Sequence, residues 1–155
     1  MSKYSVLVVE DDANMQDFLR EVLAAEGHSV LTAADGQEAL DQAVASKPDL
    51  ILLDLRMPTL DGVTFCRAIR ANPRTQNIPI IVVTSLNMPT KLEESMAAGA
   101  EDFIGKPFDV QDLTLRVRAM LKVKHVTDLH ERTHQYSIAL NQLRGHLQSP
   151  PSNVQ

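Results

Sequence analysis

The stretch that decides the fold is Asp-Leu-Ile-Leu-Leu-Asp at residues 49–54, followed by Leu-Arg-Met-Pro at residues 55–58. Four consecutive apolar residues between acidic ones predict a short strand buried on both faces, as strands of parallel sheets are. Its carboxyl end carries Asp54, at the edge where open α/β sheets place their chemistry. A carboxylate buried there is costly unless a partner compensates its charge. Asp54 is therefore the first candidate for a functional residue.

Four other short apolar runs lie along the chain, with amphipathic stretches between them. They cover residues 6–9, 29–31, 80–83 and 103–104. Side chains that can cap a helix open the amphipathic stretches, and they are Asp12, Asp35, Asp61, Thr90 and Asp109. Strands that alternate with helices predict an α/β fold, a (βα)5 doubly wound parallel sheet covered on both faces.

Composition and charge narrow the classes of function. The 155 residues suffice for one good core, and a net charge of −5 argues against nucleic acid as a direct partner. A single cysteine, Cys66, excludes a disulfide framework within the chain and a cysteine-rich metal site. No apolar stretch approaches the ~18 residues of a membrane span, and the first residues run directly into a strand. We therefore expect no signal peptide, no contact with a membrane, and a cytoplasmic location.

Polar residues follow the carboxyl ends of four of the expected strands. Right-handed crossovers bring such ends to one edge of a parallel sheet, where a reversal of strand order opens a crevice. The residues expected to converge there are Glu10, Asp11, Asp12, Asp54, Thr84, Ser85, Gly105, Lys106 and Pro107.

The chemistry of this set points to a phosphoryl group. Glu10, Asp11 and Asp54 would repel one another unless a cation compensates, and carboxylates without His or Cys select Mg²⁺ or Mn²⁺. Lys106 and the Thr84 hydroxyl suit phosphoryl oxygens. Such surroundings neutralise charge as it develops on a carboxylate nucleophile. Each feature alone has a simpler interpretation, as a helix cap, a turn residue or a solvated side chain. Such features at the ends of four different strands would rarely agree by chance.

Two other classes of protein also place chemistry at this edge. A phosphatase of the haloacid-dehalogenase type uses a strand-end Asp, but needs a second carboxylate two residues on, where this chain has Arg56. A flavin- or nucleotide-binding module needs a Gly- or Ser/Thr-rich loop after the first strand. Residues 10–12 are acidic instead and would repel phosphate without a metal.

Four stretches together resemble the receiver domain of bacterial two-component response regulators. They are residues 8–12, residues 53–58 with residues 61–62, residues 82–85 and residues 99–108. The resemblance spans about residues 3–124 and implies a flavodoxin-like sheet with strand order 2-1-3-4-5. We accordingly expect a receiver domain over residues 1–124.

The resemblance implies a signalling switch and not an enzyme beyond its own phosphorylation and dephosphorylation. A histidine kinase or a His phosphotransfer protein would donate a phosphoryl group to Asp54. Asp11, Asp54 and the backbone carbonyl of Arg56 would bind Mg²⁺, and Glu10 would act through a metal-bound water.

The remaining roles implied by the family concern the phosphoryl group and its effect. Thr84 and Lys106 would contact the phosphoryl oxygens, and Pro107 would form a rigid turn. Movement of Thr84 would let Phe103 turn inward, which alters the face made by the fourth helix, fifth strand and fifth helix. The alternative for Phe103, often Tyr in relatives, is a plain core residue. The long side chain of Arg56 and the bulky side chain of Leu86 are expected to restrict the hydrolytic water and slow dephosphorylation.

A helical pattern continues beyond the expected end of the receiver domain. Its apolar seam comprises Val126, Leu129, Thr133, Tyr136, Leu140, Leu143 and Leu147. This spacing predicts a helical extension over residues 125–148, either one long continuous helix that pairs with a second chain as a coiled coil or a seam folded back on its own domain.

We expect a homodimer through this helix, with the face of the fourth helix, fifth strand and fifth helix as a second candidate. Residues 149–155 suggest a flexible tail or linker. An alternative is a fragment of a longer regulator with a cyclic-dinucleotide or other output domain. The tail histidines, among them His130 and His134, are expected to be solvated and not to bind metal.

Overall fold

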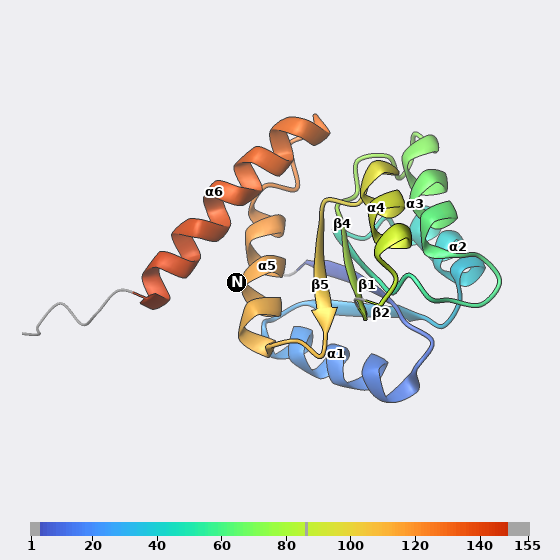
Figure 1. The fold of residues 1–155 in the computed structure, drawn as a ribbon, viewed down its shortest axis with the longest axis horizontal. Helices are drawn as coiled ribbons and strands as arrows, with labels where there is room; N and C mark the ends of the chain where they lie inside the picture. Colours follow the sequence, from blue (N-terminus) through green and yellow to red (C-terminus); the bar gives the residue numbers. More distant parts are fainter. Residues whose placement is uncertain (1–3, 86, 149–155) are drawn as a thin grey trace, which may run out of the picture.

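The structure, a computed structural model, describes residues 4–85 and 87–148, and its centre is a five-stranded parallel sheet (Figure 1). The strands run in the order β2-β1-β3-β4-β5, as expected. Their bounds are Ser5–Val9 for β1, Ser29–Ala33 for β2, Leu50–Leu53 for β3, Ile80–Ser85 for β4 and Asp102–Lys106 for β5.

Helices cover both faces of the sheet (Figure 1). Their bounds are Ala13–Ala25 for α1, Gly36–Ser46 for α2, Gly62–Ala71 for α3, Pro89–Ala97 for α4, Val110–Lys122 for α5 and Leu129–Gln148 for α6. One core joins α1, α5 and α6 to the sheet, and the other joins α2, α3 and α4 to the opposite face. In β3, Leu50 and Leu52 belong to the first core, and Ile51 and Leu53 to the second. This strand is therefore buried on both faces, as its uninterrupted apolar sequence predicts.

Four of the five predicted helix caps are confirmed. The carboxylates that accept a backbone N–H at the start of a helix are those of Asp12, Asp35, Asp61 and Asp109. The predicted cap at Thr90 is wrong, because α4 begins one residue earlier at Pro89 and its cap position, Met88, makes no side-chain hydrogen bond. Proline suits the first helical position since its fixed φ is already helical and it has no N–H to satisfy.

The continuous C-terminal helix is a wrong prediction. Helix α5 ends at Lys122, and α6 begins at Leu129, where the Asp128 carboxylate accepts the backbone N–H of Glu131. Helix α6 then lies back along α5 (Figure 1). Asp128 is a second start signal inside the apparent heptad pattern, so the chain turns there instead of extending away from the domain.

The seam expected to pair with a second chain is largely used within this one. Tyr136 and Leu140 are buried, and Val126 and Leu143 pack against the same core. Leu129 remains exposed, and the Thr133 hydroxyl donates to the Leu129 carbonyl. The side chain of Leu147 and the expected tail at residues 149–155 lie outside the described residues. The alternative of a folded-back seam therefore describes the structure.

Gly36 is required by the close approach of the loop after β3 to the start of α2. A Cβ built at Gly36 would lie 2.3 Å from the carbonyl oxygen and 2.6 Å from the Cβ of Leu60. Gly36→Ala is therefore expected to lower the free energy of unfolding by about 1–3 kcal/mol, measured by urea denaturation. The matched control is Gly145→Ala in α6, where a Cβ meets nothing within 4 Å. Equal effects of the two substitutions would contradict this account of Gly36.

Candidate functional site

The carboxyl ends of β1, β3, β4 and β5 bring the predicted site residues together around Asp54. The Asp54 carboxylate accepts hydrogen bonds from three directions. Thr84 Oγ1 lies 3.0 Å from Oδ1, the Arg56 backbone nitrogen lies 3.1 Å from Oδ1, and Lys106 Nζ lies 3.3 Å from Oδ2. Only 8% of Asp54 is exposed, so these three donors supply the partners that a buried carboxylate requires.

Lys106 is shared between two buried carboxylates. Its Nζ donates to Glu10 Oε1 at 2.6 Å as well as to Asp54. Burial raises the pKa of Glu10 above its usual range; the hydrogen bond from Lys106 lowers it in part, and the charge of Asp54 raises it again. Burial alone would lower the pKa of Lys106, but the hydrogen bond to Glu10 and the charges of Asp54 and Glu10 outweigh it, so this pKa is raised. Lys106 is thus held as a cation beside Asp54.

Three carboxylates form a group that suits a divalent cation. Glu10, Asp11 and Asp54 each offer an oxygen, and these atoms lie within 4.8 Å of one another. Asp11 is exposed, whereas the other two are buried, so the group opens to solvent on one side. An all-oxygen donor set of this kind fits Mg²⁺ or Mn²⁺. Asp12 caps α1 instead, as expected.

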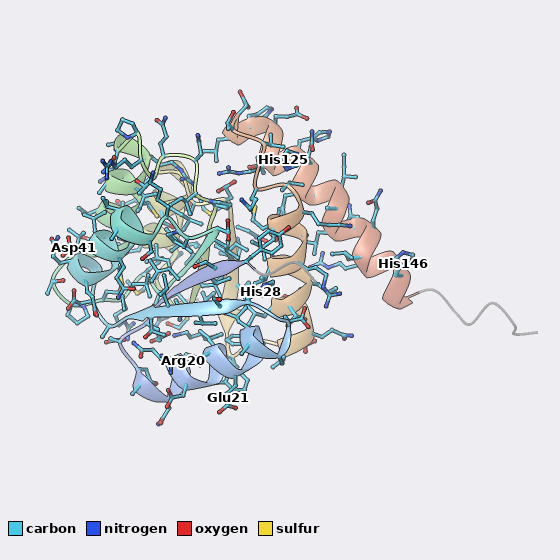
Figure 2. The ribbon with its side chains drawn as sticks, turned by 180° about the vertical axis from the view of Figure 1, so that it is seen from behind. Arg20, Glu21, His28, Asp41, His125 and His146 are labelled. Atoms are coloured by element: carbon cyan, nitrogen blue, oxygen red, sulfur yellow. The ribbon has the colours of Figure 1, made fainter. Side chains whose placement is uncertain are left out.

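Within the described residues, this acidic group is the sole cluster of three or more ligating side chains. The tail histidines are not part of it. Figure 2 shows His125 and His146 near opposite ends of α6. The ends of this 20-residue helix lie about 30 Å apart, too far for these two side chains to act on one metal ion. All four tail histidines are exposed, which agrees with the expectation that they are solvated.

Phe103 lies at the surface and not in the core. Its exposed fraction of 39% contradicts the alternative of a plain core residue. Its backbone N–H donates to Asp102 Oδ1 at 2.7 Å, and its carbonyl accepts from Arg116 at 3.3 Å.

The Lys106–Pro107 peptide bond is cis, which fits the predicted turn at Pro107.

The side chain of Arg56 extends from the loop after β3 to the loop after β4. Its guanidinium donates to Asn87 Oδ1 at 3.5 Å and lies 3.7 Å from Met88 Sδ. Leu86, the other residue expected to slow dephosphorylation, lies outside the described residues. Arg56→Ala removes this bridge beside Asp54 and is expected to shorten the lifetime of a phosphoryl group there several-fold, measured by intact-mass decay after desalting. An unchanged lifetime would contradict a shielding role for Arg56.

Sequence reasoning missed a buried network beside β5. Arg132 of α6 is 1% exposed and donates to both oxygens of Glu101, which also accepts from Arg70 and from the backbone of Ile80. No local pattern distinguishes this arginine from the surface arginines of an amphipathic helix, because its partner lies 31 residues earlier in the chain.

This fold, with acidic residues, a threonine and a lysine at the strand ends, defines the class of phosphoryl-accepting α/β modules. Residues 6–118 match the model of the response regulator receiver domain. The chain belongs to this family, and it has a phosphoacceptor role in two-component signalling.

Curated relatives and solved structures agree with this assignment. Response regulator MprA of Mycolicibacterium vanbaalenii is 39% identical over 76% of this chain and 50% of its own length. The DNA-binding dual master transcriptional regulator RpaA of Synechocystis is 36% identical over 88% of this chain and 56% of its own length. The receiver domain of sensor histidine kinase PA1611 from Pseudomonas aeruginosa, solved with magnesium in its active site cleft, has a TM-score of 0.73 at 31% identity over 78% of this chain and 99% of that one.

The extent of these matches limits what they carry over. The chain spans about half the length of the curated relatives. No helix among residues 4–85 and 87–148 has the length and apolar character of a membrane span. The receiver role is what this chain has in common with the matched part of its relatives.

Proposed function

We propose that Asp54 accepts a phosphoryl group from a phosphohistidine of a histidine kinase or His phosphotransfer protein. An oxygen of the Asp54 carboxylate attacks phosphorus, the new P–O bond forms, and the P–N bond breaks as the imidazole leaves. The observation that carries this proposal is the convergence of Thr84, Lys106 and the Arg56 N–H on the Asp54 carboxylate.

The surrounding residues have complementary roles in this proposal. Thr84 and Lys106, which contact opposite oxygens of Asp54, pass to oxygens of the phosphoryl group. Asp11, Asp54 and the carbonyl of Arg56 bind Mg²⁺ or Mn²⁺, with Glu10 acting through a bound water. The cation, when bound, neutralises negative charge shared by the carboxylates and the phosphoryl oxygens.

The effect of phosphorylation is proposed to reach the face formed by α4, β5 and α5, and from there α6. Thr84 and Phe103 are the proposed switch residues. They lie on neighbouring paired strands, where Thr84 pairs with Gly105 and Phe103 with Val82. Phe103 is exposed and has room to change its packing. The protein acts on no separate substrate, works in the cytoplasm, and dimerises through the α4–β5–α5 face in this proposal.

A longer regulator with a separate output domain is the second candidate. The observation that favours it is that the curated relatives are about twice as long as their matched regions. The haloacid-dehalogenase alternative has no such support, since the Arg56 side chain occupies the position of the required second carboxylate and reaches toward Asn87.

Acetyl phosphate tests the proposed acceptor directly. Incubation of the full chain with acetyl phosphate and Mg²⁺ is expected to add about 80 Da, the mass of one phosphoryl group, in an acid-stable and base-labile form. Chelation of the metal is expected to prevent the addition. Borohydride reduction converts an aspartyl phosphate to homoserine, so peptide mapping identifies the residue. Homoserine at any position other than 54 would overturn the assignment.

A further inference from the structure

Helix α6 is held to the receiver domain by three polar side chains, and each binds a different carboxylate. Two of the carboxylates lie at the start of β5 and one lies on α5. The pairs are Arg132 with Glu101, Tyr136 with Asp102, and Arg144 with Asp112. The spacing of four and eight residues along α6 places these three donors on one face of the helix.

Each of these carboxylates also has a partner within the receiver domain itself. The second partners are Arg70 and the Ile80 N–H for Glu101, Arg116 and the Phe103 N–H for Asp102, and Arg116 for Asp112. If α6 separated, each of the three acids would therefore keep an arginine as its counter-charge. An ion pair that is integral to a core lacks this property, since loss of one partner strands a buried charge.

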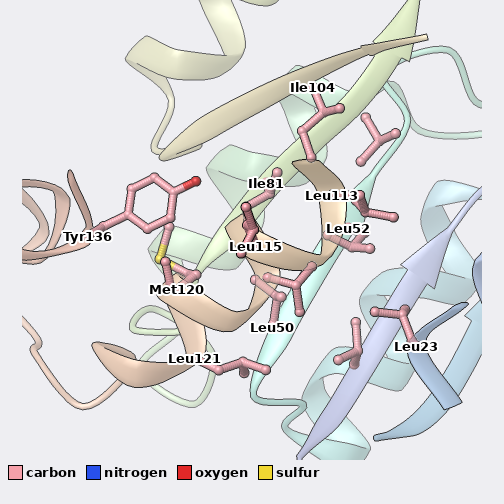
Figure 3. Packing of buried hydrophobic residues seen from close by; sticks show 14 of the residues in the cluster. Leu23, Leu50, Leu52, Ile81, Ile104, Leu113, Leu115, Met120, Leu121 and Tyr136 are labelled. Atoms are coloured by element: carbon pink, nitrogen blue, oxygen red, sulfur yellow. The ribbon is translucent and has the colours of Figure 1, made fainter. Parts of the chain in front are cut away.

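The apolar part of the contact is short. Among the α6 side chains that the structure describes, the buried apolar ones are Tyr136, Ala139 and Leu140, and Leu143 packs against the same core. Figure 3 shows the Tyr136 ring beside Met120 of α5. Most of the specificity of docking thus comes from contacts that can be broken without leaving a buried charge unpaired.

One of these contacts is joined directly to the switch residue. Asp102 Oδ2 accepts from the Tyr136 hydroxyl and from Arg116 Nη1 at 2.5 Å, while Oδ1 accepts from the Phe103 N–H. Arg116 Nη1 also donates to the Phe103 carbonyl. The backbone of Phe103 is therefore held by Asp102, which also binds α6, and by Arg116, which binds Asp102 and Asp112, two of the acids that α6 contacts. Docked α6 and outward Phe103 occur together in the structure.

We propose that α6 is a releasable latch on β5 and α5. Inward packing of Phe103 weakens the docking of α6, and docked α6 disfavours inward packing of Phe103. The inference rests on the proposed function, because a phosphoryl group on Asp54 is what favours inward Phe103. Phosphorylation then weakens the docking of α6, and by linkage the loss of docking contacts strengthens the phosphorylated state by the same factor.

Hydrogen exchange of the α6 amides in the full chain tests the latch. Beryllofluoride with Mg²⁺ serves as the phosphoryl mimic, and its binding is measured separately by titration. In the wild type it is expected to speed exchange in α6 about fivefold or more. Tyr136→Phe, which keeps the ring and removes the hydroxyl, is expected to speed exchange without beryllofluoride and to tighten beryllofluoride binding. Ser137→Ala, at the exposed neighbouring position, is expected to change neither.

The outcomes separate the two proposals. Beryllofluoride binding with unchanged α6 exchange would overturn the latch and leave the acceptor site intact. Absence of beryllofluoride binding and of the acetyl phosphate adduct would overturn the proposed function and the latch with it. Faster exchange in Tyr136→Phe with unaltered beryllofluoride affinity would also overturn the latch, since a merely structural contact would behave in that way.

Discussion

Asp54→Asn is expected to abolish the acetyl phosphate adduct, whereas the two hydrogen bonds to Oδ1 are retained. The hydrogen bond from Lys106 Nζ to Oδ2 is lost, because an amide –NH2 at that position accepts none. An amide oxygen still accepts from Thr84 Oγ1 and from the Arg56 N–H, which lie 3.0 and 3.1 Å from Oδ1. It has no negative charge and is a poor nucleophile, so no P–O bond forms. Intact-mass measurement after incubation with acetyl phosphate and Mg²⁺ gives the readout, with circular dichroism to show that the variant is folded.

The matched control for this substitution is Asp61→Asn. Asp61 is the last residue of the loop that begins with Asp54, and its carboxylate caps α3 by accepting the Thr64 N–H. Asparagine is an equally good cap. The control is expected to accept a phosphoryl group as the wild type does. An adduct of undiminished amount on Asp54→Asn would mean that another carboxylate of the acidic group is the acceptor.

The candidate site could be predicted from sequence because its geometry follows from topology. Asp54, Thr84 and Lys106 come directly at or after strand ends, and parallel strands place all such ends at one edge. No knowledge of side-chain packing is needed for that step. The orientation of Phe103 did require the structure, since one aromatic residue in a short strand is compatible with either face of an edge strand.

The C-terminal helix shows where this kind of prediction fails. A heptad seam indicates which residues face a partner helix, but it does not indicate whether that helix belongs to another chain or is α5. The signal for the turn was present, because Asp128 and Glu131 repeat the spacing of Asp35 and Glu38 at the start of α2. The buried Arg132 gave no signal, since arginine is usually exposed and its acceptor Glu101 is remote in sequence.

Glu101→Ala is expected to be among the most destabilising substitutions in the chain. The Glu101 side chain is 1% exposed and accepts from Arg132, Arg70 and the Ile80 N–H. Its removal leaves two guanidinium groups without their counter-charge, although both keep backbone carbonyl acceptors, and one buried N–H without its acceptor. Breaking a buried pair in this way costs about 3–5 kcal/mol, measured as the free energy of unfolding in urea.

Arg132→Ala removes the other side of the same ion pair but is expected to cost less, about 1–3 kcal/mol. Glu101 keeps Arg70 at 3.0 Å and the Ile80 N–H at 3.1 Å, so no buried charge is stranded. Glu131→Ala, at the exposed position before Arg132, is the control and should lie within about 0.5 kcal/mol of the wild type. Equal costs for Glu101→Ala and Arg132→Ala would show that Arg132 is integral to the core and that Arg70 cannot balance Glu101 alone. Unequal costs in the expected order would mean that Arg70 and the Ile80 N–H suffice to pair Glu101 when the contact from α6 is lost.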